Sequence, residues 1–435
     1  PRDKYVRNQG AIGWDFEHDF TRNITFHSNV KWSEYLEKTP IGYYSGGGLI
    51  NTTDPSMPTY FRTVQQYNFT YREHVGSFAA DNRLDVDFDT GPVSQKALIG
   101  VDYRQVYNSA AFGFGFGGTL DAFNPVYPAM ITTNLGYPIP YNDERLRQTG
   151  AYGQDQLRLG DLYVTLGGRY DWVDVADRLT GADVGQQKFT YRVGASYVTS
   201  AGIAPYISWA TSFEPVIGTD SVTGQPFKPS DGNQIEGGVK FDARGLPPGI
   251  KLFATASVFD IHQSNVVSTV PSITPVFGTQ TGRVEVYGAE LEFVARFYDR
   301  LSINGSYSYD HSRVTASSTP AEIGHPLPTT PENKASLFGD YTLSKGFAAG
   351  LGFGFGVRYT DGSAGALPGP FNPVVYQGQA ATLFDAIIHY DLPGWRFSVN
   401  GSNIFDKAYV ARCSGPAGCF YGAGRQVIGT ITKRF

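Results

Sequence analysis

The sequence of 435 residues has only two cysteines and two methionines, and only 17% of its residues are charged. It has no run of about 18 apolar residues, which excludes a membrane-spanning helix. The net charge is -5 without any run of lysine and arginine, which argues against a nucleic-acid partner. The seven histidines are scattered and show no metal-ligand spacing with the cysteines. We therefore expect no metal site and no cofactor.

Aromatic residues and glycine are abundant instead. The chain has 28 tyrosines, 30 phenylalanines and 52 glycines, yet hydrophobic residues make up only 41% and the mean hydropathy is -0.25. This composition is typical of the wall of a β-barrel with a polar interior. Lipid-facing and lumen-facing residues alternate along each strand of such a wall, so they cancel in the average hydropathy.

Alternation of period two dominates the chain and predicts strands. Between positions 162 and 172 the even residues are mostly apolar and end in Tyr170 and Trp172, whereas the odd ones include Arg169 and Asp171. The ranges 189–197, 301–309 and 383–392 repeat this pattern. Several of these segments exceed the usual length of about 5–6 residues and end in aromatic residues, as at a membrane interface. The sequence predicts an all-β transmembrane barrel.

The connections alternate between short turns and long loops, which is the layout of an outer-membrane barrel. Turns are predicted at 21–23, 91–92, 160–161, 201–202, 246–249, 299–300, 344–345 and 393–394, and loops at 39–59, 112–142, 217–231, 264–282, 316–330 and 361–377. This gives about 17 antiparallel strands, although single-chain bacterial barrels have an even number. Plugged transporters have about 22. We expect residues 1–435 to be the C-terminal part of such a barrel, with the first strands and the plug missing.

The order of several motifs resembles TonB-dependent siderophore receptors, and most closely ferric hydroxamate (ferrichrome-type) receptors. The similar segments cover nearly the whole chain. They are residues 81–84, 88–91, 98–103, 151–156, 164–171, 206–215, 288–292, 403–409 and 422–427, with a terminal aromatic at Phe435. Lys433 departs from the usual terminal-strand pattern, but a lysine near the membrane edge can extend its charged end to water at small cost.

The two cysteines, Cys413 and Cys419, are close in sequence. They suggest a small loop disulfide and an exported, oxidising location, the alternative being two free thiols. The last loop of the resembling receptors is also closed by a pair of cysteines. We prefer a structural role for this disulfide to a redox role.

In the resembling receptors, aromatic residues on loops and upper strands surround a ferric hydroxamate. The resemblance places this role on Tyr43, Tyr44, Phe112 and Phe114. Ser414 stands where the family has an aromatic residue, and Tyr421 could replace it. Aromatic rings suit a compact neutral chelate because they supply contact area without charge. The plain alternative for each ring is packing at the interface or within a loop.

Other motifs have simpler interpretations. Residues 113–118 superficially match a glycine-rich phosphate loop but lack the following helix and acidic residue. We interpret them as a flexible external loop or as an aromatic part of the ligand vestibule, and residues 352–356 as barrel wall. An acidic stripe at Asp85, Asp87 and Asp89 indicates a solvated lumen surface rather than a Ca²⁺ site. We interpret His262 and His389 as ordinary barrel residues.

No catalytic constellation stands out, so we do not expect an enzyme. The resemblance implies TonB-dependent uptake of a ferric siderophore across the bacterial outer membrane. Its partners would be the siderophore, the TonB complex acting through the plug, and outer-membrane lipid and lipopolysaccharide, with the receptor a monomer. One alternative is another cargo, such as a different ferric chelate, cobalamin or a saccharide. A second is a passive porin, which has about 16–18 strands.

Overall fold

The computed structural model describes residues 4–41, 43–51, 53–126, 135–216, 220, 225–270, 277–369, 374–413 and 419–433. The only helical element in these ranges is the 3-10 turn η1 (Pro320–Glu322), and all others are strands. None of the described helical residues forms a helix long and apolar enough to cross a membrane. The all-β class predicted from the period-two alternation is confirmed.

The chain divides into two units. The first contains β1 (Lys4–Thr21), β2 (Ile24–Ile41), β3 (Tyr43–Leu49), β4 (Thr63–Thr90), β5 (Val93–Asp121) and the larger parts of β6 (Ile139–Leu159), β7 (Leu162–Asp177) and β8 (Ala182–Tyr197). The second contains all or most of β9 (Ile203–Glu214), β10 (Ser230–Asp242), β11 (Ile250–Val270), β12 (Phe277–Phe297), β13 (Leu301–Ala316), β14 (Asn333–Thr342), β15 (Leu351–Thr360), β16 (Ala381–Leu392), β17 (Trp395–Ser402), β18 (Val410–Cys413), β19 (Cys419–Tyr421) and β20 (Gln426–Lys433).

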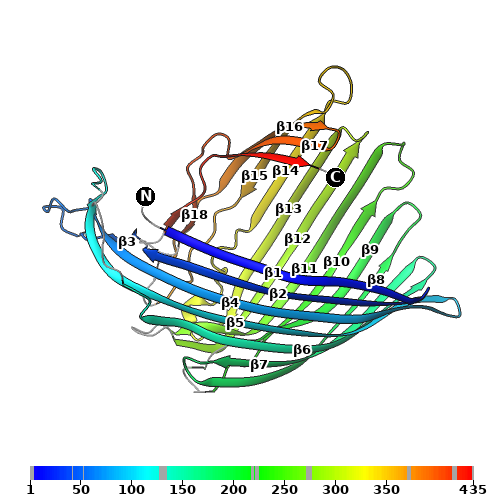
Figure 1. Ribbon diagram of the computed structural model, residues 1–435, viewed down its shortest axis with the longest axis horizontal. Coiled ribbons are helices and arrows are strands. Elements are labelled where there is room, and N and C mark those ends of the chain that lie inside the picture. The colour runs from blue at the N-terminus through cyan, green and yellow to red at the C-terminus, as the bar shows by residue number, and fades with distance from the viewer. Residues whose placement is uncertain are drawn as a thin grey trace. The chain divides into compact units, whose positions relative to one another are not determined.

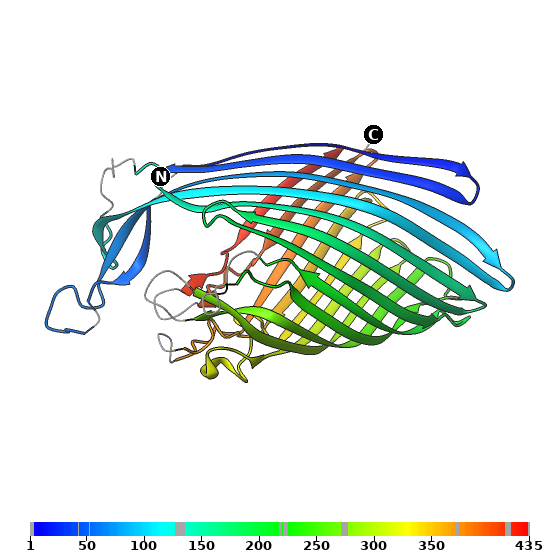
Figure 2. The same ribbon diagram turned by 90° about the horizontal axis from the view of Figure 1, so that it is seen from below.

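In the first unit, β1 pairs with β2, β2 with β4, and β4 with β5, all antiparallel. Figure 1 shows these four strands side by side, and Figure 2 shows their length. β4 has 28 residues and β5 has 29, whereas a tilted strand crosses a bilayer with about 9–11. Gly91 closes this hairpin with a φ of 62°, a left-handed conformation that glycine adopts without strain. The hairpin therefore extends well beyond the thickness of a membrane.

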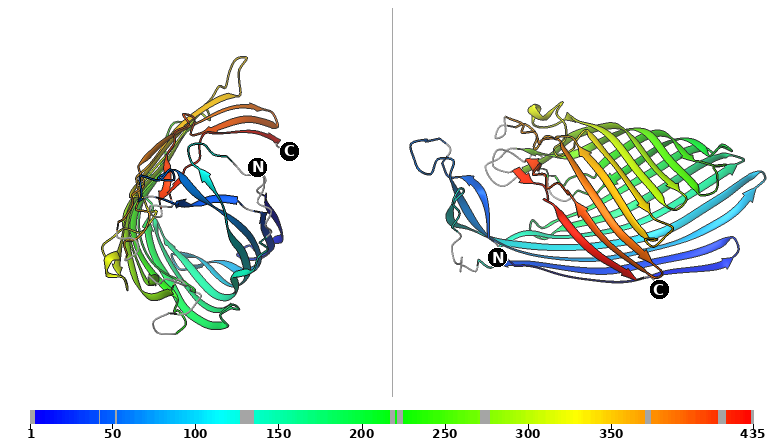
Figure 3. Two further views of the ribbon diagram at one scale, coloured as in Figure 1. Left: turned by 90° about the vertical axis from the view of Figure 1, so that its left-hand side faces the viewer. Right: turned by 90° about the horizontal axis from the view of Figure 1, so that it is seen from above.

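In the second unit, successive strands from β9 to β17 pair with one another, antiparallel from β10 onward, and β17 pairs antiparallel with β20. The C-terminal strands of this series run side by side in Figure 3, where they are coloured orange and red. β18 and β19 form a separate two-stranded sheet in which Cys413 lies opposite Cys419, and Cys419 is disulfide-bonded. Asn403 organises this region, because its side-chain amide donates to the carbonyls of Lys407 (3.0 Å) and Ala423 (3.1 Å). The motif at residues 403–409 therefore helps to hold this region together.

The number of strands agrees with the sequence-based count. The main sheet contains 18 named strands, but β2 and β3 both pair with β4 and so occupy one position in the wall. The described residues therefore fill 17 positions. The full complement of about 22 strands and the missing plug remain predictions.

Each wall strand has a polar and an apolar face. On β7, Leu166 and Trp172 are each 45% exposed, whereas Asp171 on the other side is 1% exposed. This confirms the alternation predicted for positions 162–172. We call the side that carries Asp81, Asp102 and Arg169 the polar face. The opposite side, which carries Phe78 and Ile99, is the apolar face, because residues one apart on a strand point to opposite sides.

The predicted turns separate strands as expected, but three loops are shorter than the ranges predicted from the sequence. β3 occupies much of 39–59, β5 continues to Asp121, and β11 and β12 extend into 264–282. Residues 113–118 therefore belong to a strand, and their interpretation as a flexible loop was wrong. The physical reason is that glycine and phenylalanine alternate there with period two, so the rings line one face while the glycines admit a neighbouring segment on the other.

Candidate functional site

Six aromatic residues form two facing rows on β4 and β5, which we call the aromatic wall. The register places Tyr71 opposite Phe112, Phe69 opposite Phe114, and Tyr67 opposite Phe116. Ring centroids lie 5.7 Å apart for Phe69 and Phe112, and 5.0 Å apart for Tyr67 and Phe114. Offset and tilted ring pairs at such distances stabilise one another.

The aromatic wall lies on the polar face. Tyr71 and Asp81 are separated by an even number of positions on β4, which pairs with β5 without a register shift between these rows, so they share a side. The other side of the same segment is packed, since Gln66, Asn68 and Thr70 are only 1–2% exposed. The aromatic rings are thus presented to the side that carries the charged residues.

Glycines on β5 explain how the packed side forms. A Cβ atom added at Gly113 would lie 2.8 Å from the Gly136 carbonyl oxygen and 2.6 Å from Thr70 Oγ1. At Gly115 it would lie 3.2 Å from a Leu135 methyl. The segment around residues 135–136 can therefore pack against β5 only because side chains are missing there.

The predicted binding residues fall in different places. Phe112 and Phe114 belong to the aromatic wall, and Phe114 is 42% exposed. The backbone of Tyr43 lies opposite Asn68 and that of Tyr44 opposite Tyr67, so β3 pairs with β4, whose other neighbour, β5, carries Phe112 and Phe114. Tyr421 belongs to the second unit, on β19, and is 80% exposed. Ser414 lies outside the described residues.

Sequence reasoning missed four of the six members of this wall. Tyr67, Phe69 and Tyr71 complete it from β4, Phe116 extends it, and Tyr141 of β6 lies 6.2 Å from Phe112. The missed signal was the alternation of aromatic residues at 67, 69 and 71, which matches that at 112, 114 and 116.

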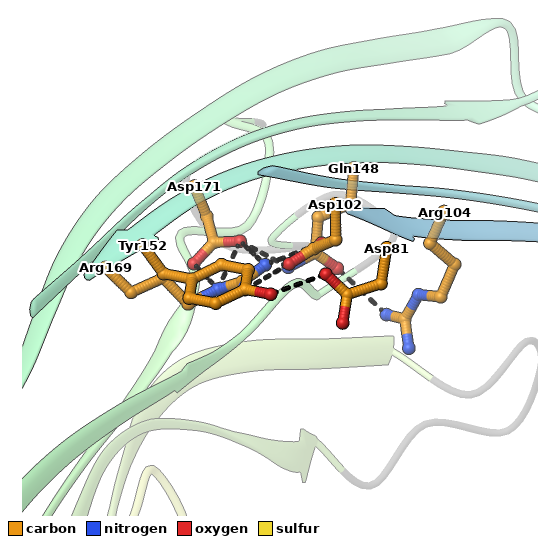
Figure 4. A network of polar contacts seen from close by, with 7 residues as sticks. All are labelled: Asp81, Asp102, Arg104, Gln148, Tyr152, Arg169 and Asp171. Carbon is orange, nitrogen blue, oxygen red and sulfur yellow. Dashed lines mark hydrogen bonds and ion pairs between the residues drawn. The ribbon is translucent and has the colours of Figure 1, made fainter. Parts of the chain in front are cut away.

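A polar network on the same face is centred on Arg169 (Figure 4). Its guanidinium donates to Asp102 Oδ1 at 2.9 Å and to Asp171 at 2.6 and 2.8 Å. Gln148 joins the network by donating to Asp171 at 2.7 Å and accepting from Arg104 at 3.0 Å. The Tyr152 hydroxyl donates to Asp81 at 2.5 Å. The network therefore ties β4, β5, β6 and β7 together through charge-assisted hydrogen bonds.

Two glycines leave room for the network. A Cβ atom at Gly150 would lie 1.9 Å from Arg169 Nη2, and one at Gly100 would lie 2.4 Å from the Tyr152 ring. A concave region of about 720 Å³ borders the network and is lined by residues that include Gly13, Lys31 and Arg104. These features make the polar face uneven and charged between the aromatic wall and the turn at Gly91.

Three histidines of the second unit, His262, His311 and His389, lie beside carboxylates. Ligand atoms of Asp260, His262 and Glu285 lie within 4.8 Å of one another, but Arg313 already forms an ion pair with Glu285 at 2.6 Å. The arginine supplies the positive charge that a metal would bring.

His389 is almost fully buried. Its Nε2 lies 3.2 Å from Asp340 Oδ1 and its Nδ1 2.9 Å from Asp391 Oδ2. It therefore links β14 and β16, a structural role that the sequence did not reveal.

The end of the β4–β5 hairpin beyond the aromatic wall is closed by an ion pair. Arg62 Nε lies 2.6 Å from Asp121 Oδ2, and the backbone N–H of Phe123 donates to Asp121 Oδ1 at 2.9 Å. The bond from Arg62, reinforced by that from Phe123, holds the pKa of Asp121 below its usual range. The carboxylate therefore stays charged and fixes the entry into the next loop.

Comparisons with known proteins agree with this architecture. The family model described as TonB dependent receptor-like, beta-barrel matches residues 1–404. The ferrichrome outer membrane transporter/phage receptor of Escherichia coli (strain K12) is 32% identical over 462 residues, covering 99% of this chain and 59% of that protein. The ferrioxamine B receptor of Salmonella typhimurium (strain SL1344) is 31% identical over 445 residues, covering 100% of this chain and 59% of that protein.

Two solved structures show the same fold. The siderophore receptor PiuA from Acinetobacter baumannii superposes with a TM-score of 0.82 at 19% identity, covering 100% of this chain and 65% of that one. The ferric-catecholate import receptor Fiu from K12 E. coli has a TM-score of 0.81 at 20% identity, with coverages of 100% and 65%. The chain spans about three fifths of the length of the curated relatives it matches.

Proposed function

Because the chain belongs to the TonB-dependent receptor family, we propose that it forms most of the barrel of a receptor that imports a ferric siderophore of the hydroxamate type. This family consists of transporters and receptors rather than enzymes, and its barrels lie in the bacterial outer membrane. The polar face then lines the interior of the barrel and the apolar face contacts lipid.

The aromatic wall is the observation that carries this proposal. It gathers six rings on the polar face of two strands that reach far beyond a membrane span. Rings supply large contact areas for a compact chelate, and their orientation is fixed by mutual packing. The two relatives described above are receptors for ferrichrome and ferrioxamine B, which supports a hydroxamate as cargo.

Energy coupling follows the family. The TonB complex would act through a plug domain, and the receptor would work as a monomer in lipid and lipopolysaccharide. No resident cofactor is needed, because iron enters only as part of the cargo. The passive-porin alternative loses its support, because the family model covers residues 1–404 and the relatives are receptors and transporters.

Binding to the purified full-length receptor tests the proposal. We expect ferrichrome or ferrioxamine B to quench intrinsic tryptophan and tyrosine fluorescence in a saturable way, with no response to a ferric catecholate or cobalamin. Replacing Phe112 and Phe114 together by alanine should weaken hydroxamate binding at least tenfold, because each ring loses most of its contact area. A response to cobalamin or the catecholate alone would overturn the hydroxamate assignment.

A further inference from the structure

Next to the aromatic wall, two glutamates face each other on the polar face. Glu37 of β2 lies directly opposite Glu73 of β4, and directly opposite positions place Cβ atoms about 4.5–5.5 Å apart. The row continues to Arg7 on β1 and to Ala110 on β5. We call these four residues the carboxylate row. Like charges in this arrangement repel each other, so the row is unfavourable unless something offsets it.

Among the described residues, only the charge of Glu37 is offset by a cation. Glu37 is 12% exposed and its Oε2 accepts hydrogen bonds from the hydroxyls of Tyr5 and Tyr35 and from Arg7 at 3.4 Å. Glu73 interacts with the hydroxyl of Tyr71, which carries no charge. Within the described part of the chain, no lysine or arginine forms an ion pair with Glu73.

The nearest cations along the strands point the other way. Lys38 and Arg72 lie opposite each other one position along β2 and β4, so the pleat directs them to the apolar face. Arg72 lies over the ring of Tyr137 at 5.5 Å. The polar face beside the aromatic wall therefore keeps one negative charge in excess over this row.

Aromatic rings surround this excess charge. Tyr5, Tyr35 and Tyr71 flank the carboxylate row, and Phe112 lies opposite Tyr71 as the first ring of β5 in the aromatic wall. A carboxylate beside tyrosine rings suits a protonated amine, which gains a charge-assisted hydrogen bond and cation–π contacts. A neutral group gains neither, and an anionic group is repelled.

We propose that Glu37 and Glu73 select, among ferric hydroxamates, those that carry a protonated amine. This inference rests on the proposed function, because it assigns the charge preference of the same binding surface. The iron centre would lie on the aromatic wall, while the amine arm of the cargo would reach the carboxylate row and pair with Glu73.

A pair of matched ligands tests the proposal on the full-length receptor. Ferrioxamine B has a free primary amine, and its N-acetyl derivative has the same iron centre with a neutral arm. We expect the amine form to bind about tenfold more tightly, because one hydrogen bond between charged groups raises the affinity by about that factor. Because the carboxylate row is partly exposed, raising the salt concentration should reduce this ratio.

The variant Glu73→Gln removes the charge and keeps the shape. It should bring the ratio of the two affinities close to one, because only the amine form loses a charged partner. Asp89→Asn is the matched control, because it makes the same charge change on the same face near the other end of β4. It should leave the ratio as in the wild type.

Two results would overturn the inference while leaving the proposed function intact. One is equal binding of both ligands by the wild type, and the other is an undiminished ratio in Glu73→Gln. If neither hydroxamate binds, but a ferric catecholate or cobalamin does, the proposed function itself is wrong and the inference falls with it.

Discussion

Replacing Arg169 by alanine should destabilise the first unit more than any exposed charge change on the same face. Asp171 is 1% exposed and receives hydrogen bonds from Arg169 at 2.6 and 2.8 Å, and Asp102 receives one at 2.9 Å. Without the guanidinium, Asp171 keeps only Gln148 as a side-chain donor among the described residues. The variant thus leaves a buried carboxylate without its counter-charge.

The size of the effect follows from burial. Breaking a fully buried ion pair costs about 3–5 kcal/mol. The Arg169 side chain is 31% exposed and that of Asp102 is 23% exposed, so water screens part of the interaction and we expect a loss of about 2–3 kcal/mol. Thermal unfolding of the full-length receptor in detergent, followed by circular dichroism, should show a melting temperature lower by several degrees.

A control on the same face separates this effect from a general loss of charge. Lys96 Nζ lies 3.9 Å from Asp87, and both side chains are more than half exposed, at 74% and 56%. Lys96→Ala should therefore change stability by less than about 0.5 kcal/mol. Replacing Arg169 by methionine together with Asp102→Asn and Asp171→Asn should recover part of the loss, since no charge stays unpaired. If Arg169→Ala melts like Lys96→Ala, the network does not stabilise the wall and the reasoning is refuted.

Three further predictions concern other parts of the chain. In Gly352→Ala the new Cβ would lie 2.1 Å from Nε2 of the buried His389, so we expect a loss of about 1–3 kcal/mol. Gly339→Ala, where nothing lies within 4 Å, should melt closer to the wild type; equal melting of both variants would contradict the predicted clash. Cys419→Ser should destabilise the closed loop by about 2 kcal/mol, seen as faster protease cleavage between β18 and β19 with unchanged melting of the wall. Unchanged cleavage would show that the disulfide does not hold the loop. Because the pKa of Asp121 is lowered in the fold, its pairing with Arg62 stabilises the fold above the usual carboxyl range and is lost as the pH falls through the lowered pKa. Protection of the Phe123 amide from hydrogen exchange, measured relative to an unstructured peptide at the same pH, should therefore fall in acid and in Asp121→Asn at neutral pH, and protection unaffected by that substitution would refute this role.

The sequence was sufficient for the fold class and for the number of strands. Alternation on segments such as 162–172 carries that information locally, because each strand shows both of its faces in its own residues. It also located two members of the aromatic wall, Phe112 and Phe114, although through resemblance to a family rather than through the alternation itself.

What the sequence could not supply was the register between strands. Glu37 and Glu73 are far apart in the chain, and only the pairing of β2 with β4 shows that they face each other. The same holds for Arg169 of β7 and its partner Asp102 of β5. The loop boundaries were wrong for another reason, because the composition of glycine-rich stretches such as 113–118 predicts loops, whereas their period of two is typical of a strand.

The unbroken ladder between β4 and β5 limits how this protein can change in evolution. From Tyr71 opposite Phe112 to Thr90 opposite Val93, every position of one strand has a partner on the other. Inserting one residue in the middle of β5 would turn Phe112 and Phe114 to the opposite face of the strand while Asp102 stayed in place. Inserting two residues would preserve the faces and only shift the rings along the wall. Length variants of this hairpin should therefore be tolerated in even steps within the strands, while odd changes should accumulate at the turn around Gly91 or require a bulge.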